Sequence, residues 1–267
     1  MCLLCHSQYC SGQIFQIVRS SSIPGQRLRC TSVLFQHYLY SRHPNTDSAD
    51  SFHSFLDAAL QYYLPKDCPS FCIGCLNCTL RGEHTCKDAA RVQKIAASLL
   101  DADLIVMTSP AYVFHVTGAM KTLLDHFAYL WIPHRPAPEM FTKRAVIITQ
   151  CLGSGGKSAA KDIKRSLAWW GISDIKLFTG KLMSDIMWDR LTEKKRFELT
   201  KKITALSEKC IRIDYAKPAW TNPITKLKFL ICRMMQKSLH EKDPEYLDGK
   251  YWAEQGWLGT ARPWKSR

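Results

Sequence analysis

The chain has 267 residues, of which 46% are apolar and 22% charged, so it can bury a sizeable core and does not have the composition of a disordered chain. No apolar run reaches the roughly 18 residues of a membrane-spanning helix, so we expect no membrane insertion. The formal net charge is +14, and residues 176–267 hold 20 Lys and Arg against 11 Asp and Glu. Acidic residues interrupt the basic runs, which argues against nucleic-acid binding.

Residues 1–31 contain four cysteines, three arginines and no acidic residue, and neither a helix period nor a strand period runs through them. We therefore expect a poorly ordered N-terminal segment over 1–31. The segment lacks the pattern of a secretory signal, which favours a cytoplasmic location. In a reducing compartment, the twelve cysteines of the chain favour metal binding or redox chemistry over structural disulfides.

Strands and helices alternate from residue 32 onwards. Apolar, aromatic and β-branched runs predict strands at 32–40, 103–109, 143–150 and 174–180, and the short "YYLP" (62–65) marks one more only weakly. Helical spacing of apolar positions predicts helices at 47–63, 89–102, 117–131 and 159–171. This alternation predicts an α/β fold with a parallel sheet. The continuous apolar strands "LIVM" and "AVII" suit a sheet that is covered on both faces.

Beyond residue 181, apolar spacing predicts helices at 191–213 and 222–239, followed by an aromatic tail. Trp252, Trp257 and Trp264 lie within thirteen residues of one another, which indicates a tail that packs against a folded surface. We expect this surface to belong to the chain's own domain, and the alternative is a partner subunit or the active site.

The segment "FCIGCLNCTLRGEHTCKD" (71–88) arranges its cysteines as Cys72-x2-Cys75-x2-Cys78-x7-Cys86. Four-cysteine zinc sites usually divide into two separated pairs, whereas three cysteines at successive x2 spacings plus one more resemble the ligands of a [4Fe–4S] cluster. The sequence favours the cluster and leaves two alternatives open, a zinc ion and a cysteine string without metal. Cys68 is a spare neighbour.

Three loops follow predicted strands, at 41–46, 109–115 and 150–156, and ligands of parallel sheets bind at the ends of strands. In "SRHPNT", backbone N–H groups and hydroxyls at a helix start could hold a phosphate, or the stretch is an ordinary helix cap. In "SPAYVF", an aromatic ring at the sheet edge could flank a planar ligand or be a partly buried rim residue. In "CLGSGGKS", flexible backbone can approach a flat ligand closely, and the alternative is a plain turn.

Several motifs together resemble the flavodoxin-like NAD(P)H-dependent FMN reductase family, and within it the iron–sulfur flavoprotein branch. They are "SRHPNT", "CIGCLNC…C", "DADLIVMTSPAYVFHVTGAMKTLLDHF", "HRP" (134–136) and "TQCLGSGG". The resemblance covers roughly residues 32–180. It implies a three-layer flavodoxin-like fold with a five-stranded parallel sheet in the order 2-1-3-4-5. The chain would then divide into the N-terminal segment 1–31, an FMN-binding domain 32–180 and a C-terminal helical extension 181–267.

The resemblance also implies ligand-binding residues at the three strand ends. The residues expected to hold the FMN phosphate are Ser41, Asn45 and Thr46. Those expected along the isoalloxazine ring are Ser109, Pro110, Ala111, Tyr112, Val113 and Phe114. Those expected at its other edge are Gly153, Ser154 and Gly155, while Cys72, Cys75, Cys78 and Cys86 would be the cluster ligands. The family's Gly-Ser-Pro-Arg after the first strand reads Tyr40-Ser41-Arg42 here, so the phosphate loop departs from the family's pattern.

The function that the resemblance implies is that of an FMN-dependent oxidoreductase, in which NAD(P)H gives hydride to the flavin and electrons pass on to a small-molecule or protein acceptor. No side chain is obliged to act as acid or base, since the flavin carries the chemistry. His134 and Arg135 could bind the nucleotide phosphate or be a surface loop. A homodimer is expected. The alternatives are a non-enzymatic flavodoxin-type electron carrier, which the basic charge disfavours, and a zinc-stabilised nucleic-acid-binding module.

Overall fold

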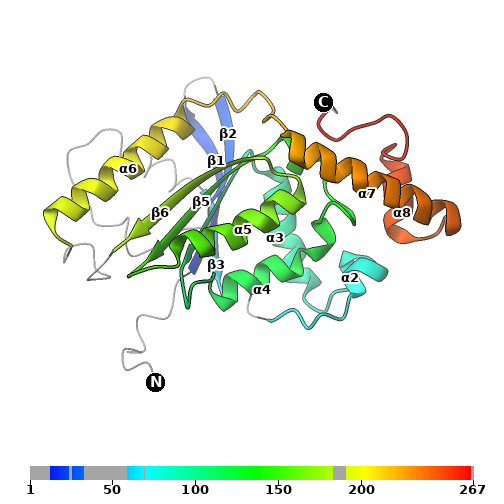
Figure 1. Ribbon diagram of the computed structural model, residues 1–267, viewed down its shortest axis with the longest axis horizontal. Coiled ribbons are helices and arrows are strands. Elements are labelled where there is room, and N and C mark those ends of the chain that lie inside the picture. The colour runs from blue at the N-terminus through cyan, green and yellow to red at the C-terminus, as the bar shows by residue number, and fades with distance from the viewer. Residues whose placement is uncertain (1–12, 24–25, 33–58, 69, 183–190, 266–267) are drawn as a thin grey trace.

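The computed structural model describes residues 13–23, 26–32, 59–68, 70–182 and 191–265 (Figure 1). These residues form one β-sheet with helices packed against it, followed by a helical C-terminal part. The strands are β1 (Gln13–Ile23), β2 (Gln26–Ser32), β3 (Ala59–Leu64), β4 (Leu104–Pro110), β5 (Arg144–Cys151) and β6 (Asp174–Lys181). The helices of the sheet region are α2 (Asn77–Leu80), α3 (Ala89–Asp101), α4 (Gly118–His126) and α5 (Gly156–Trp170).

The sheet has six strands in the order β1-β3-β2-β4-β5-β6, so the expected α/β class with a parallel sheet is confirmed. Strands β2 to β6 pair in parallel, whereas β1 is antiparallel to β2, β3 and β4. The structure therefore differs from an all-parallel sheet of five strands. Without β1 the order of the strands is β3-β2-β4-β5-β6. Strand β1 pairs with β2 and with the strands on both sides of it, β3 and β4, so it interrupts this order. The order 2-1-3-4-5 therefore stays a prediction.

The N-terminal part differs from the sequence expectation where it is described. Residues 13–23 and 26–32 are strands, although no strand period marks them, because they pair with each other as an antiparallel ladder and with β3 and β4. Backbone hydrogen bonds of this kind need no side-chain pattern. The strand predicted at 32–40 lies almost wholly outside the described residues. The division at residues 31 and 180 remains a prediction.

The strongly apolar segments fold as expected. The pairs Leu104↔Arg144 to Pro110↔Gln150 and Arg144↔Asp174 to Cys151↔Lys181 hold β4, β5 and β6 in an unbroken parallel register. All seven residues of β4 are buried, as the run of apolar residues predicts for a central strand. The expected helix at 47–63 is wrong over its last residues, since β3 begins at Ala59, and the weakly marked "YYLP" strand is confirmed within β3.

The main core lies between the sheet and helices α3, α4 and α5. Their buried positions recur at helical spacing: Val92, Ile95, Ala96 and Leu99 on α3, Met120, Leu123 and Leu124 on α4, and Ala159, Ala160, Ile163, Leu167 and Trp170 on α5. Helix α4 starts at Thr117, whose side chain accepts a hydrogen bond from the backbone N–H of Met120. It ends at His126, earlier than the expected helix 117–131, and a 3₁₀ turn (Ala128–Leu130) follows.

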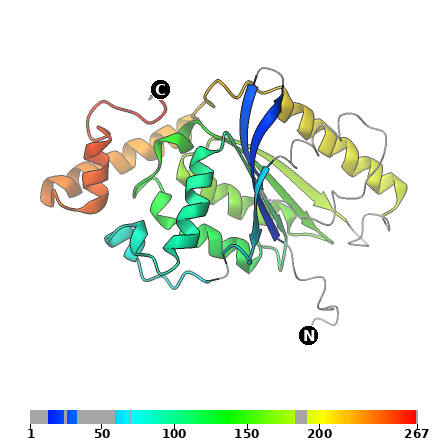
Figure 2. The same cartoon turned by 180° about the vertical axis from the view of Figure 1, so that it is seen from behind.

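The C-terminal part contains α6 (Glu193–Ile211), α7 (Pro223–Lys242) and α8 (Leu247–Glu254). Helix α6 packs beside β6, whereas α7 and α8 lie at the opposite end of the molecule together with the C-terminus (Figures 1 and 2). Trp252 and Trp257 are buried around Phe229 of α7 and Phe141, with Trp264 packed against them. The aromatic tail thus packs onto its own chain. Over the described residues, no helix combines the length and apolarity that crossing a membrane requires.

Candidate functional site

The loops that follow β4 and β5 leave the same edge of the sheet. In the parallel register Ser109 lies opposite Thr149 and Pro110 opposite Gln150, and β4 ends at Pro110. The backbone N–H of Ala111 donates to the carbonyl of Gln150 at 2.7 Å. Residues 111–117 and 152–155, which we call the loop pair, therefore begin side by side at the carboxyl edge of the parallel strands, where ligands of such sheets bind.

A glycine brings the two loops into contact. Gly155 has a φ of +95°, and a Cβ placed on it would lie 2.8 Å from the Cα of Phe114. Any other residue would meet the backbone of the neighbouring loop as well as the cost of the left-handed conformation. Gly153 differs, because a Cβ there would meet nothing within 4 Å and would point into open space. The glycine loop is thus tight at one position and open at another.

The tip of the first loop exposes three apolar side chains. Tyr112 and His115 close a tight turn, with the N–H of each donating to the carbonyl of the other at 2.9 and 3.0 Å. Between them, Val113 and Phe114 have φ values of 47° and 68°, which is rare for non-glycine residues and for a β-branched one above all. Val113 is 89% exposed, so burial does not stabilise this conformation. Strained, exposed apolar residues at a ligand-binding edge suit a planar apolar partner.

The second loop leads into the N-terminus of α5. Its N-cap is Gly155, which offers no side-chain cap, so the first-turn N–H groups point toward the loop with the positive end of the helix dipole. On α5, Asp162 accepts from the backbone N–H of Val116 at 3.4 Å and lies 2.9 Å from His115 Nδ1. His115 and Asp162 thus tie the first loop to α5. The sequence analysis did not single them out, because no spacing connects residues 47 positions apart.

The predicted flavin residues divide into four groups. Five are exposed on the loop pair and are available to a ligand: Tyr112, Val113, Phe114, Gly153 and Ser154. Ala111 and Gly155 are half-buried, and Ser109 and Pro110 are buried in β4. The Ser109 hydroxyl donates to the carbonyl of Pro110 and accepts from the N–H of Thr117, so it shapes the loop from inside. Ser41, Asn45 and Thr46, predicted for the phosphate, lie outside the described residues.

The cysteines lie on a second segment, residues 70–88, which we call the thiol segment. Cys72, Cys78 and Cys86 are half-buried and Cys75 is exposed, and none of the four forms a disulfide. Burial raises the pKa of the Cys78 thiol, and the neighbouring thiols of Cys86, Cys72 and Cys75 raise it further. The charges of the other three thiols thus reach Cys78, although no three of the described cysteines bring their sulfurs within 4.8 Å of one another.

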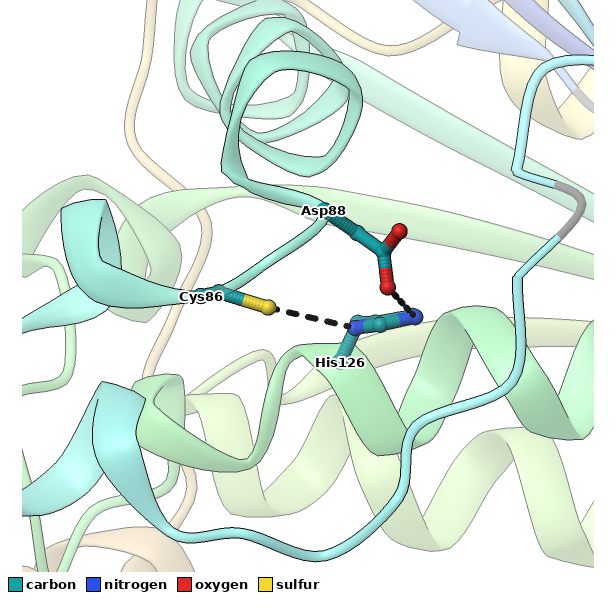
Figure 3. Close-up of side chains that lie close together, drawn as sticks. All are labelled: Cys86, Asp88 and His126. Carbon is teal, nitrogen blue, oxygen red and sulfur yellow. Dashed lines mark hydrogen bonds and ion pairs between the residues drawn. The ribbon is translucent and has the colours of Figure 1, made fainter.

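One cysteine has neighbours that its motif does not predict. The ligand atoms of Cys86, Asp88 and His126 all lie within 4.8 Å of one another (Figure 3). The Cys86 sulfur lies 3.9 Å from Nδ1 of the buried His126 ring, while Nε2 lies 3.7 Å from the Asp88 carboxylate and 2.9 Å from the carbonyl of Ser70. Because a carbonyl can only accept, Nε2 donates to Ser70, and Nδ1 is the ring nitrogen that faces Cys86.

This arrangement defines what each side chain can do. An ion held by Cys86 could use Nδ1 of His126 as a further ligand, with the opposite ring nitrogen fixed by Ser70 and Asp88 as outer-sphere partners. The Asp88 carboxylate has a lowered pKa, chiefly because Lys87 donates a hydrogen bond to it. The sequence does not predict His126 and Asp88 as neighbours of Cys86, because His126 lies in a different motif, "TGAMKTLLDHF", forty residues further along the chain.

The thiol segment is anchored by a buried ion pair. The guanidinium of Arg135 donates to the carbonyls of Cys78 and Thr79 and to the carboxylates of Asp248 and Glu83. Asp248, fully buried on α8, also accepts from Tyr246 and lies 2.8 Å from His134 Nδ1. His134 and Arg135, considered for a nucleotide phosphate, therefore have a structural role, because their polar groups are engaged by Asp248.

A separate surface cavity of about 570 Å³ lies at the opposite edge of the sheet. It is lined by residues at the starts of β4 and β5, among them Asp103 and Arg144. Parallel sheets bind their ligands at the other edge, so this cavity does not compete with the loop pair as the candidate site.

The chain is similar to known flavoproteins over the segment that carries both loops. The model of the NADPH-dependent FMN reductase family matches residues 54–179, which include both loops and the thiol segment. An iron-sulfur flavoprotein of Archaeoglobus fulgidus is 27% identical over 103 residues, 39% of this chain and 44% of that protein. FMN-dependent NADH:quinone oxidoreductase 2 of Pseudomonas putida is 30% identical over 95 residues, 32% of this chain and 48% of that protein. The predicted resemblance is thereby confirmed.

These matches are partial. The chain spans about half the length of the curated relatives it matches. Among solved structures, an azoreductase from Bacillus anthracis aligns with 45% of this chain and 62% of its own, at 14% identity and a TM-score of 0.36.

Proposed function

We propose that this chain binds FMN at the loop pair and acts as an NAD(P)H-dependent flavin oxidoreductase. The observation that carries the proposal is the exposed, strained Tyr112–Phe114 tip facing a glycine loop at the carboxyl edge of the parallel strands. This edge lies within the segment that matches the FMN reductase model. The bound flavin would accept hydride from NAD(P)H and release electrons to an acceptor.

The residues of the loop pair would position the ring rather than move protons. The exposed apolar tip supplies a surface for one part of the isoalloxazine, and the open space at Gly153 leaves room for its edge. The uncapped N–H groups at the start of α5 would stabilise negative charge on the reduced ring. The predicted phosphate contacts of Ser41, Asn45 and Thr46 belong to the same proposal.

The thiol segment fits a metal group by its donor set. Four cysteines without a disulfide lie on one short segment, and thiolates are the ligands of iron–sulfur clusters. We propose that Cys72, Cys75, Cys78 and Cys86 hold a [4Fe–4S] cluster, which would pass electrons singly. The sulfur of Cys86 and the ring nitrogen Nδ1 of His126 make a mixed donor set, with Asp88 as an outer-sphere partner, and this favours zinc as the second candidate. The quinone in the name of one relative makes quinones the first acceptor class to test.

The test is anaerobic purification followed by absorbance spectroscopy, with FMN, iron, sulfide and zinc counted per chain. We expect bound FMN and oxidation of NADH or NADPH. FMN binding without nicotinamide oxidation would leave only an electron carrier, and absence of FMN binding would end the proposal.

A matched pair of variants ties binding to the loop pair. Gly153→Val places a side chain in the open space, so FMN affinity should fall at least about tenfold while thermal stability stays unchanged. Gly118→Val is the control, since a Cβ at Gly118 also meets nothing within 4 Å but lies at the start of α4. Unaltered FMN affinity in Gly153→Val would place the flavin elsewhere.

A further inference from the structure

Helix α7 has two apolar faces, and the protein core covers one of them. The covered face comprises Thr225, Phe229, Cys232 and Gln236. Phe229 stacks on Trp252, and the Gln236 side-chain amide donates to the carbonyl of Pro133 at 2.6 Å. Neighbouring residues on a helix are rotated by about 100°, so positions two residues from Phe229 lie on the far side of the helix.

The far side is also apolar. The exposed large apolar residues of α7 are Ile224, Leu227, Leu230, Ile231, Met234 and Met235. Four of them follow one another at steps of three, four and three residues, which makes one continuous stripe, and Ile224 and Met234 are 68% and 67% exposed. The residues span about 16 Å of helix axis. Contiguous exposed apolar surface of this kind marks an interaction site.

An exposed tryptophan precedes the helix, and basic residues border the stripe. Trp220, just before α7, is 67% exposed, and Lys226 Nζ lies 5.7 Å from the centre of its ring. From residue 215 to 240 the chain contains no Asp or Glu, and its basic residues are Lys217, Lys226, Lys228, Arg233 and Lys237. On α6, in contrast, Glu193, Glu198 and Glu208 alternate with lysines.

We propose that the outward face of α7 docks on an anionic lipid surface, lying parallel to it without crossing it. Apolar side chains would enter the headgroup region while the bordering lysines contact anionic headgroups, and Arg233, which donates to the carbonyl of Leu258, adds its positive charge. The exposed Trp220 suits the same boundary. Helix α7 runs along the outside of the molecule at the end away from α6, so a flat surface can approach it (Figures 1 and 2).

The positive charge beside the stripe favours an anionic lipid surface over a second copy of the chain. Two antiparallel α7 helices related by a twofold axis would bring the same flanks together, so the flank that carries Lys226, Arg233 and Lys237 would face the basic residues of its copy. The first acidic residue after 214 is Glu241, at the end of the helix, where it pairs with Lys237. An anionic membrane complements the whole border, and a second copy repels it.

The experiment measures sedimentation of the full chain with vesicles of phosphatidylcholine alone and with vesicles containing about one third phosphatidylglycerol. Wild-type protein should bind the anionic vesicles, and binding should fall as salt is raised. The double variant Ile231→Asp/Met234→Asp should bind at least about tenfold more weakly. Phe197→Asp is the matched control, because Phe197 is 73% exposed on the mixed-charge α6, and it should bind like wild type.

Charge reversal separates the two contributions. Lys237→Glu should weaken binding to anionic vesicles, and Lys201→Glu on α6 should not. Failure of wild-type protein to bind any vesicle would overturn the proposal, as would full binding by the double variant. A wild-type dimer in analytical ultracentrifugation that the double variant breaks, with no vesicle binding, would assign the stripe to a second copy instead. Circular dichroism confirms that each variant is folded.

Discussion

The loop pair and the thiol segment lie on the same domain but hold their shapes by different means. The loop pair grows directly out of β4 and β5, and its own backbone closes it: the turn from Tyr112 to His115 and the contact of Gly155 with Phe114 are both local to the sheet edge. The thiol segment has only a one-turn helix and a 3₁₀ turn of its own. It depends on Arg135 and Asp248, more than fifty residues away along the chain.

This difference predicts which substitutions should disturb each region. A backbone-closed loop is disturbed by changes of volume or φ within it, whereas a segment held by a buried ion pair fails when a distant carboxylate is removed. The following substitutions test this contrast, beginning with the largest expected effect.

Removal of the buried carboxylate should have the largest effect. Asp248→Ala leaves the Arg135 guanidinium buried without its main partner, so we expect the free energy of unfolding to fall by about 3–5 kcal/mol in urea titration. Glu83→Gln is the control, because its carboxylate is partly exposed at 3.3 Å from the same guanidinium and should cost under about 1 kcal/mol. Equal effects of the two would mean that Asp248 is not the anchor.

This anchor also shows what the sequence could not predict. The apolar runs at 103–109, 143–150 and 174–180 predicted strands β4, β5 and β6 within a residue or so, because burial of continuous apolar strands is a local property. The ion pair between Arg135 and Asp248 forms only because α8 packs against the residues around Arg135, and no spacing of residues in the sequence predicts it. The same holds for β1, whose backbone pairs with three strands, two of which lie far along the chain.

In the candidate site, too, some residues could be predicted from the sequence and others only from the packed structure. The motif "SPAYVF" and the glycine loop predicted which residues stand at the ligand-binding edge, since each follows a well-marked strand. His126 and Asp88 were missed because α4 brings a histidine to a cysteine forty residues earlier, and the function of such a pair appears only once the helix is packed.

Removal of the histidine ring should weaken metal binding without abolishing it. In His126→Ala the Cys86 thiol loses the ring that faces it, and we expect about 10- to 100-fold weaker retention of the metal in chelator competition. His84→Ala is the matched control, because His84 belongs to the same segment but is exposed. Unchanged iron and zinc content in His126→Ala, at wild-type stability, would mean that the ring does not support the metal site.

A single methyl group should distinguish the two glycines of the loop pair. Gly155→Ala places a Cβ 2.8 Å from the backbone of Phe114 in a left-handed conformation, so we expect a loss of about 1–2 kcal/mol in thermal unfolding. Gly153→Ala meets nothing within 4 Å and should change stability by less than about 0.5 kcal/mol. A stable Gly155→Ala would show that the two loops can separate without cost.

The last prediction needs no substitution, because it compares the alkylation rates of different cysteines within the wild-type protein. Burial raises the pKa values of Cys68 and Cys232 to about 11, so at pH 8 only about one in a thousand of these thiols is a thiolate and both should react slowly with iodoacetamide. Cys75 is exposed and should be alkylated before Cys68 and Cys232 in metal-free protein, as peptide mass spectrometry can show. Reconstitution with metal should then protect Cys75 and leave the slow rate at Cys68 unchanged, because only the first would be a ligand. Equal labelling of Cys75 before and after reconstitution would remove it from the metal site, and protection of Cys68 would make that spare cysteine a ligand in its place.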